Sequence, residues 1–415
     1  MQTPVGQDIV PLDELEQHVR FIPADQKRRA EIEGAGGKVP KIFCTIPVER
    51  DMMSPEAREF LEGADVYEYT HHTCLNAEQM AALLGNPDRQ DIDQVLCFME
   101  PITEGNWRSD MPESARHVAS AAMGFDNKNV AVAKETGMVY TNAPGTLFDD
   151  VAETAVVLTL TSLLRYDANT TMVKAGSQVG CSMYDGRHPG MYNYTLENGI
   201  RVGHIGGGET GSATMRRLIP FVYRADGKGS IVYSDPVEYP EKEAALNGLV
   251  EANIRARVLE GKGDPNAPVE FDPIHCVSFD ELITTSDVIF VQCPLTKDEP
   301  PKGTRHLINM EILEKIRNAG RKPFIVNTAR GPIVDEEAIA VALRGGWIAG
   351  YVTDVAENES ARPTHLYDAA REGGTLYVNT AHTASNTANR NNMVNRAVLN
   401  LRSLWLGEGP LNPVG

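Results

Sequence analysis

A glycine-rich turn between a strand-like run and a helix-like run constrains the fold of this chain more than any other feature. Ile200–Ile205 has the composition of a buried strand, Gly206–Gly211 reads GGGETG, and Ser212–Tyr223 reads as a helix. Glycines at these positions permit a tight turn, close approach of a pyrophosphate to the backbone, and close packing of helix on strand. The pattern therefore predicts a dinucleotide-binding βαβ unit with phosphates at the helix N-terminus.

An aspartate after the next strand-like run extends this pattern. Ser230–Ser234 is followed by Asp235, which lies 24 residues beyond Gly211, close to the offset of about 20 typical of the ribose-binding acid. A carboxylate there accepts from the ribose hydroxyls and repels a 2′-phosphate, so we predict NAD rather than NADP as the cofactor. The cofactor-binding residues predicted from this unit are Gly206, Gly208, Glu209, Thr210, Gly211 and Asp235.

Composition limits the partners. The 415 residues include 39 Lys and Arg against 57 Asp and Glu, a net charge of −18, which argues against nucleic acid or an anionic membrane surface. A small anionic substrate remains compatible, because a few placed cations can bind it. The N-terminus has no signal-peptide pattern, the most apolar stretch (Val151–Leu164) is too short to span a bilayer, and the six cysteines form no C-x-x-C pair. We expect a cytoplasmic protein without a metal site.

Polar residues follow strand-like runs in the second half of the chain. Arg330 comes after one such run, Asp354 and Glu359 after the next, and His382 after a third. Ligands of doubly wound sheets bind at the carboxyl ends of the strands. An arginine can bind a carboxylate through two hydrogen bonds, a histidine can exchange a proton near neutral pH, and a neighbouring glutamate can orient it. Each residue alone is compatible with an ordinary surface or core position, but together they suit hydride transfer to a carbonyl carbon.

The ordered motifs resemble those of the D-isomer-specific 2-hydroxyacid dehydrogenase family. The runs GGGETG, VQCPLT, IVNTARGPIVDEEA, IAGYVTDVAENES and NTAHTASNT carry the resemblance, which extends from about residue 41 to the end of the chain. It implies that Arg330 binds the substrate carboxylate, that His382 is the general acid and base, and that Glu359 orients His382. The implied reaction interconverts a small 2-oxo acid and its D-2-hydroxy acid with NAD.

The resemblance also implies further contacts. Asp354 would receive the nicotinamide carboxamide, and the cofactor would further be lined by Cys293, Pro294, Thr328, Ala329, Arg330 and His382. Met123 and Gly124 would offer backbone N–H groups to the substrate carboxylate, beside Arg330 and His382. Cys293 departs from the family pattern, since many members have histidine there.

The expected architecture is α/β, with two Rossmann-like doubly wound parallel-sheet domains and a cleft between them. Residues 1–40 are predicted to form an arm. Residues 41–144 with 386–415 would form a flavodoxin-like substrate domain, and residues 145–385 an NAD-binding domain with an insert at about 238–272. The apolar helix Val151–Leu164 is expected at the domain junction and at a homodimer interface.

Alternative functions stay open at this point. Formate or phosphite oxidation occurs on the same fold; formate enzymes carry glutamine where this chain has Glu359, which disfavours formate, whereas phosphite oxidation keeps the arginine, glutamate and histidine. An alternative of another class is a corepressor-like binding protein that senses NAD(H), because such proteins retain the same residues.

Overall fold

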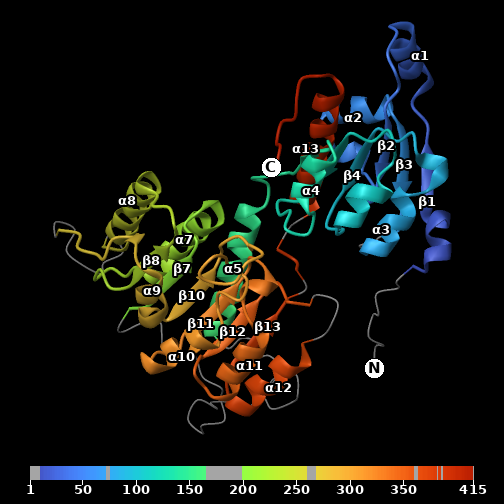
Figure 1. The fold of residues 1–415 in the computed structure, drawn as a ribbon. Coiled ribbons are helices and arrows are strands. Elements are labelled where there is room, and N and C mark those ends of the chain that lie inside the picture. The colour runs from blue at the N-terminus through green and yellow to red at the C-terminus, as the bar shows by residue number, and fades with distance from the viewer. Residues whose placement is uncertain are drawn as a thin grey trace, which may run out of the picture. The chain divides into compact units, whose positions relative to one another are not determined.

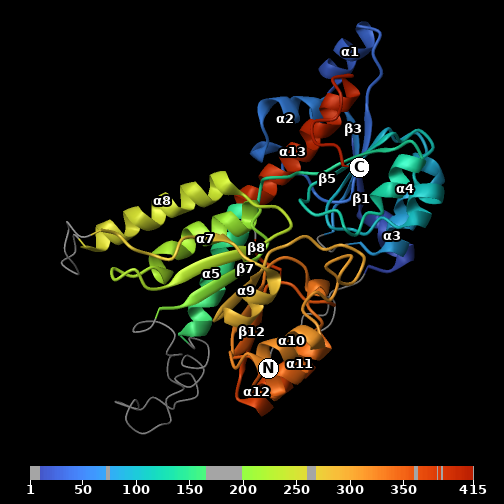
Figure 2. The same ribbon diagram turned by 60° about the vertical axis from the view of Figure 1, so that its left-hand side comes forward.

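The chain forms two compact units, each built on its own open β-sheet (Figures 1 and 2). The computed structural model describes residues 10–71, 75–164, 199–258, 268–358, 363–380, 382–384 and 387–414. The first unit comprises Met1–Leu147 with Ser385–Gly415, and the second Phe148–Ala384. The predicted α/β class with parallel sheets is confirmed. None of the helices described is long and apolar enough to cross a membrane.

The sheet of the first unit has six strands in the order β1-β3-β2-β4-β5-β6. All neighbours are parallel except β1 and β3, where Val19 lies opposite Tyr69. The segment predicted to be an arm therefore contributes an antiparallel edge strand. The strands are β1 (Val19–Ile22), β2 (Lys41–Cys44), β3 (Asp65–Tyr69), β4 (Gln94–Cys97), β5 (His117–Ser120) and β6 (Val139–Thr141).

Helices cover both faces of this sheet. On one face α2 and α13 bury Leu61 and Leu401 against Ile42 of β2, and on the other α3 and α4 bury Leu83 and Ala133. The first-unit helices are α1 (Gln26–Gly34), α2 (Pro55–Glu62), α3 (Ala77–Leu84), α4 (Val130–Glu135) and α13 (Thr387–Trp405), with short helical turns at Leu12–His18, Arg50–Met52, Pro87–Arg89 and Asn106–Asp110.

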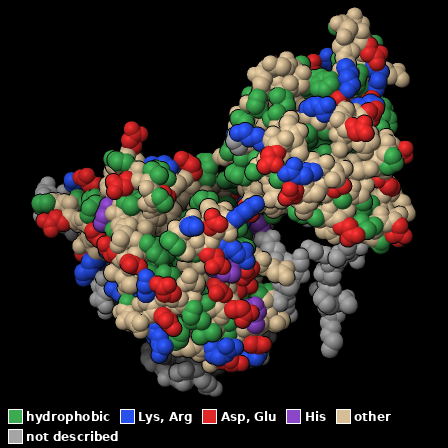
Figure 3. All heavy atoms as spheres, in the orientation of Figure 1, with side chains coloured by type: hydrophobic (Ala, Val, Ile, Leu, Met, Phe, Trp, Pro, Cys, Tyr) green, Lys and Arg blue, Asp and Glu red, His purple; other side chains and the backbone are tan. Residues whose placement is uncertain are grey.

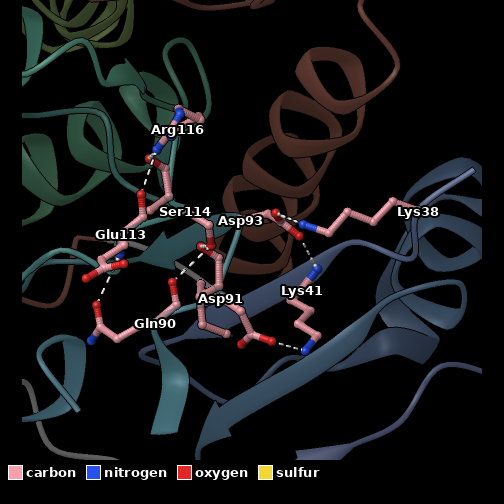
Figure 4. Close-up of polar contacts among 10 residues, drawn as sticks. Lys38, Lys41, Gln90, Asp91, Asp93, Glu113, Ser114 and Arg116 are labelled. Atoms are coloured by element: carbon pink, nitrogen blue, oxygen red, sulfur yellow. Dashed lines mark hydrogen bonds and ion pairs between the residues drawn. The ribbon is translucent and has the colours of Figure 1, made fainter. Parts of the chain in front are cut away.

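Polar side chains join the segments that lead into β2, β4 and β5 (Figure 4). The carboxylate of Asp93 accepts from the Lys38 ammonium and from the backbone N–H of Lys41 at 3.0 Å, and the Lys41 ammonium pairs with Asp91. The Ser114 hydroxyl donates to the carbonyl oxygen of Gln90 at 3.1 Å. These contacts fix the amino ends of the strands, which leaves the carboxyl ends as the edge available for ligands.

The sheet of the second unit has seven parallel strands in the order β13-β12-β11-β10-β7-β8-β9. Val288 of β10 lies opposite Val202 and Phe324 of its neighbours. The central strands of this sheet are buried on both faces, which explains their nearly continuous apolar runs. The seven strands are β7 (Arg201–Ile205), β8 (Ser230–Ser234), β9 (His275–Cys276), β10 (Val288–Val291), β11 (Phe324–Asn327), β12 (Gly350–Thr353) and β13 (Leu376–Asn379).

The helices of this unit also cover both faces of its sheet. The helices α5 (Phe148–Leu163), α7 (Glu209–Val222) and α8 (Pro240–Arg257) share one core, and α9 (Phe279–Thr285), α10 (Met310–Asn318), α11 (Glu336–Arg344) and α12 (Thr364–Gly373) share the other. Figure 2 shows α8 lying alongside α7. The helix α8 of the predicted insert therefore packs as part of the domain, because its residues Leu246, Val250 and Ile254 are buried. Within this chain α5 is not covered on every face, since Val157 is 58% exposed.

Candidate active site

The glycine loop between β7 and α7 has one glycine open to a ligand and others held close to backbone. A Cβ on Gly206 (φ +107°) would lie 2.7 Å from the carbonyl oxygen of Gln292, and one on Gly211 would lie 2.1 Å from that of Gly206. A Cβ on Gly208, which caps α7, would meet no described heavy atom within 4 Å. The loop therefore offers a backbone surface at a helix N-terminus that a phosphate can approach, as a dinucleotide requires.

Asp235 lies at the carboxyl end of β8 and contacts this loop. One carboxylate oxygen accepts from the backbone N–H of Gly207 at 2.9 Å, and the other accepts from that of Val237 at 3.0 Å. The residue predicted to bind the ribose therefore also holds the glycine loop, a role that sequence spacing did not reveal.

A buried polar network lies beneath the loop. The Thr214 hydroxyl donates to the carbonyl oxygen of Thr210 at 2.9 Å and accepts from the Gln292 amide at 2.7 Å. The Gln292 side-chain oxygen lies 3.1 Å from Nδ1 of His204, whose ring stacks on Phe290. Burial lowers the pKa of His204 to about 4, so the ring is neutral at pH 7. The network joins β7, α7 and the end of β10.

Cys293 and Pro294 follow β10, beside the glycine loop. Burial raises the pKa of the Cys293 thiol to about 12, so this side chain is a protonated thiol at neutral pH. The carbonyl oxygen of Pro294 accepts from the Thr304 hydroxyl at 2.7 Å. The segment therefore presents no reactive side chain beside the glycine loop.

The loop that carries Arg330 is organised by Asn327, the last residue of β11. The fully buried Asn327 amide donates to the carbonyl oxygen of Arg330 at 2.9 Å and accepts from the backbone N–H of Ala329 at 3.1 Å. The Arg330 guanidinium donates to the carbonyl oxygen of Ala329 at 2.9 Å. The hydroxyl of Thr328 is buried and has no hydrogen-bond partner in the part of the chain described, which leaves it available to a ligand.

The next loop, after β12, packs directly on Arg330's neighbour. A Cβ on Gly331 would lie 2.0 Å from the carbonyl oxygen of Ala356. The backbone N–H of Glu357 donates to the buried carboxylate of Glu336 at 2.9 Å. The side-chain carboxylate of Glu357 lies 2.9 Å from Nε2 of His306. These contacts fix the loop that leads to Glu359, which itself lies outside the described residues.

Asp354, at the start of that loop, holds the segment around His382. Its carboxylate accepts from the Thr380 hydroxyl at 2.5 Å and from the backbone N–H groups of Thr383 and Ala384 at 2.9 and 3.0 Å. Its carbonyl oxygen accepts from the backbone N–H of His382 at 2.9 Å. Asp354 is only 1% exposed, and its carboxylate serves donors of the protein. The contact with the nicotinamide that the family resemblance implies stays a prediction.

The structure thus brings Arg330, Asp354 and His382 to the carboxyl ends of the adjacent strands β11, β12 and β13. Met123 and Gly124 belong to the first unit, in the turn after β5, where the carbonyl oxygen of Met123 accepts from the Asn142 amide at 2.7 Å. Sequence reasoning missed Gln292, although it precedes the recognised Cys-Pro pair.

The second unit combines a parallel sheet, a glycine loop that a phosphate can approach, and Asp235 at the end of the next strand. Arg330 and His382 lie at strand ends of the same sheet. These features define a nicotinamide-dependent oxidoreductase. Residues 243–384 match the model of the D-isomer specific 2-hydroxyacid dehydrogenase, NAD binding domain. The chain is 30% identical over 326 residues to a glyoxylate reductase of Thermofilum pendens, covering 77% of this chain and 80% of that protein. The chain belongs to the D-isomer-specific 2-hydroxyacid dehydrogenase family.

Other relatives agree. A glyoxylate/hydroxypyruvate reductase of Arabidopsis thaliana is 28% identical over 308 residues, or 74% of this chain and 80% of that protein. The fold is shared with the crystal structures of a glyoxylate reductase from Paecilomyes thermophila (TM-score 0.67, 22% identity, 91% of this chain and 98% of that one) and of D-mandelate dehydrogenase from Rhodotorula graminis (TM-score 0.69, 19% identity, 91% and 98%). The protein is an NAD-dependent 2-hydroxyacid dehydrogenase, which interconverts a 2-oxo acid and a 2-hydroxy acid.

Proposed function

We propose that the enzyme reduces a small 2-oxo acid of the glyoxylate and hydroxypyruvate kind to its D-2-hydroxy acid, with Arg330, His382 and Glu359 as the catalytic residues. The observation that carries this proposal is the placement of Arg330 and His382 on loops that end nearby strands of one sheet. The names of the relatives, glyoxylate reductase and glyoxylate/hydroxypyruvate reductase, support the substrate class.

Arg330 binds the substrate and polarises it. Its planar guanidinium can donate to both oxygens of a carboxylate, which fixes the 2-oxo carbon in one orientation. The Asn327 amide holds the backbone of Arg330. This reduces the conformational entropy that the Arg330 loop loses when substrate binds. Met123 and Gly124 of the first unit add backbone N–H groups to the same carboxylate.

His382 moves the proton. Its imidazole donates a proton to the carbonyl oxygen as the 2-hydroxy acid forms and takes it back in the reverse direction. Glu359 accepts from the other ring nitrogen and so orients the imidazole. Bound NADH supplies the hydride that reaches the carbonyl carbon.

Asp354 acts as a positioning residue. Its carboxylate and carbonyl oxygen accept from residues on both sides of His382 and from His382 itself.

The cofactor is held on one side by the backbone of Gly206, Gly208, Glu209, Thr210 and Gly211 together with Asp235, and on the other by Cys293, Pro294, Thr328 and Ala329. The open position at Gly208 and the buried, unsatisfied hydroxyl of Thr328 support this placement. The carboxylate of Asp235 favours NAD over NADP. We place α5 at the interface of a homodimer, because the apolar side chain of Val157 on this helix is 58% exposed.

A substrate panel tests the proposal. NADH oxidation is followed with glyoxylate, hydroxypyruvate, pyruvate and larger 2-oxo acids, and NAD reduction with formate and phosphite. We expect turnover with a small 2-oxo acid. NADH binding without turnover of any 2-oxo acid, together with oxidation of phosphite, would refute the proposed substrate class.

A further inference from the structure

An ion pair spans the N-termini of α7 and α8 beside the glycine loop. The Lys242 ammonium lies 3.0 Å from the carboxylate of Glu209, the first residue of α7. Glu209 is 71% exposed and Lys242 31% exposed along their side chains. The pair therefore stands at the mouth of the site where the dinucleotide phosphates are expected. Acidic and basic side chains are interspersed over the face that Figure 3 draws. The effect of a single lysine on a bound anion therefore depends on the groups beside it.

The lysine is held in place by more than the glutamate. Its ammonium lies 4.6 Å from the centroid of the Tyr239 ring, a cation–π contact. Tyr239 is fixed in turn, because its backbone N–H donates to the Tyr233 hydroxyl at 2.9 Å. A Cβ on Gly207 would lie 3.0 Å from the Tyr239 ring. The Tyr239 ring therefore packs beside the glycine loop and holds the Lys242 ammonium close to it.

Charge at this mouth is otherwise unfavourable for a pyrophosphate. The pKa of the Tyr239 hydroxyl is raised, first by burial and then by the negative charges of Asp235 and Glu209. Both carboxylates therefore lie close to this ring. The N-terminus of α7 favours an anion, but the Glu209 carboxylate competes with a phosphate for that position and repels it. A dinucleotide brings negative charge to this place, so the glutamate must be neutralised.

We propose that Lys242 supports cofactor binding indirectly: it neutralises Glu209 and so allows the dinucleotide phosphates to approach the N-terminus of α7. The inference rests on the proposed function only in placing the phosphates at the glycine loop. It assigns a role to the segment at 238–272 that the family resemblance left without one. The chemistry requires only that the ligand carry a pyrophosphate anion.

A double-mutant cycle on NADH binding tests this role. The dissociation constant for NADH is measured by the change in its fluorescence, without substrate, for the wild type, Lys242→Met, Glu209→Gln and the double variant. We expect Lys242→Met to raise the dissociation constant by about threefold to tenfold. Addition of Glu209→Gln should restore most of the lost affinity, and the loss should shrink as the ionic strength rises.

Lys228→Met is the matched control. It removes the same charge from an exposed turn at the opposite end of β8 from Asp235, where the ammonium lies 3.6 Å from Asp226. It should leave NADH binding unchanged. An unchanged dissociation constant in Lys242→Met, or a double variant as weak as Lys242→Met, would overturn the inference while leaving the proposed function intact. Failure of the wild type to bind NADH would overturn both.

Discussion

The backbone N–H of His382 donates to the carbonyl oxygen of Asp354 at 2.9 Å, and His382 has a left-handed backbone with φ of +51°. A non-glycine residue rarely adopts this conformation without surrounding support. Asp354 supplies that support, since its carboxylate also accepts from the backbone N–H groups of Thr383 and Ala384. The orientation of the proposed proton donor therefore depends on a buried carboxylate on the neighbouring strand.

Replacement of Asp354 by Asn should impair turnover without weakening the binding of NADH. One carboxylate oxygen accepts from Thr383 and the other from Ala384. An amide has only one acceptor oxygen, so it loses one of these hydrogen bonds and the segment around His382 shifts. We expect kcat to fall by about 10- to 100-fold, with the pH profile of kcat altered and the dissociation constant of NADH unchanged.

Asp226→Asn, on an exposed turn of the same unit, provides the comparison and should behave as the wild type. If Asp354→Asn instead weakens NADH binding and keeps kcat at saturation, the carboxylate contacts the nicotinamide and does not position His382.

Gly331→Ala should destabilise the protein. The added methyl group would lie 2.0 Å from the carbonyl oxygen of Ala356, so the loops after β11 and β12 must separate. We expect the free energy of unfolding in urea to fall by roughly 1–3 kcal/mol.

Gly248→Ala makes the same change inside α8, where an added Cβ meets no described atom within 4 Å. It should stabilise the protein by about 0.5–1 kcal/mol. Equal effects of the two substitutions would show that the contact between Gly331 and Ala356 is absent in solution.

His204 should make stability depend on pH. Its pKa is lowered to about 4 in the folded chain and is about 6.5 in the unfolded one. Between these values the unfolded chain binds more protons, so the free energy of unfolding falls as the pH falls from about 6.5 to about 4. His204→Phe keeps a flat ring on Phe290 and should reduce the slope by up to about 1.4 kcal/mol per pH unit. An identical slope in this variant would mean that His204 is not buried in its neutral form.

Asp235→Asn should relax the choice of cofactor. The amide keeps an acceptor for the backbone N–H of Gly207 but removes the charge that opposes a 2′-phosphate. We expect the ratio of kcat/KM for NADPH to that for NADH to rise by about tenfold. An unchanged ratio would assign the discrimination to other residues.

Local patterns were sufficient to predict the second unit's βαβ core. The glycine run, the apolar strands and the offset to Asp235 are all short-range features, and each follows from the geometry of a strand followed by a helix. The helix expected over Val151–Leu164 is present but spans Phe148–Leu163. Helix ends are set by fine local geometry that composition reflects poorly.

Long-range contacts were beyond the sequence. Val19–Ile22 reads as part of a polar arm, yet it pairs with β3 through residues more than forty positions away. The role of Asp354 is of the same kind, because it depends on the parallel pairing of β12 with β13. Lys242 was hidden for another reason: only the packing of α8 beside α7 brings it to Glu209.

Arg330 is proposed to bind the carboxylate of a 2-oxo acid that NADH reduces. The most direct test is kcat/KM for glyoxylate with NADH in the wild type and in Arg330→Ala, with the NADH dissociation constant measured in parallel. We predict a loss of about 10²- to 10³-fold in kcat/KM, with NADH binding retained. Wild-type kcat/KM in Arg330→Ala would contradict the claim.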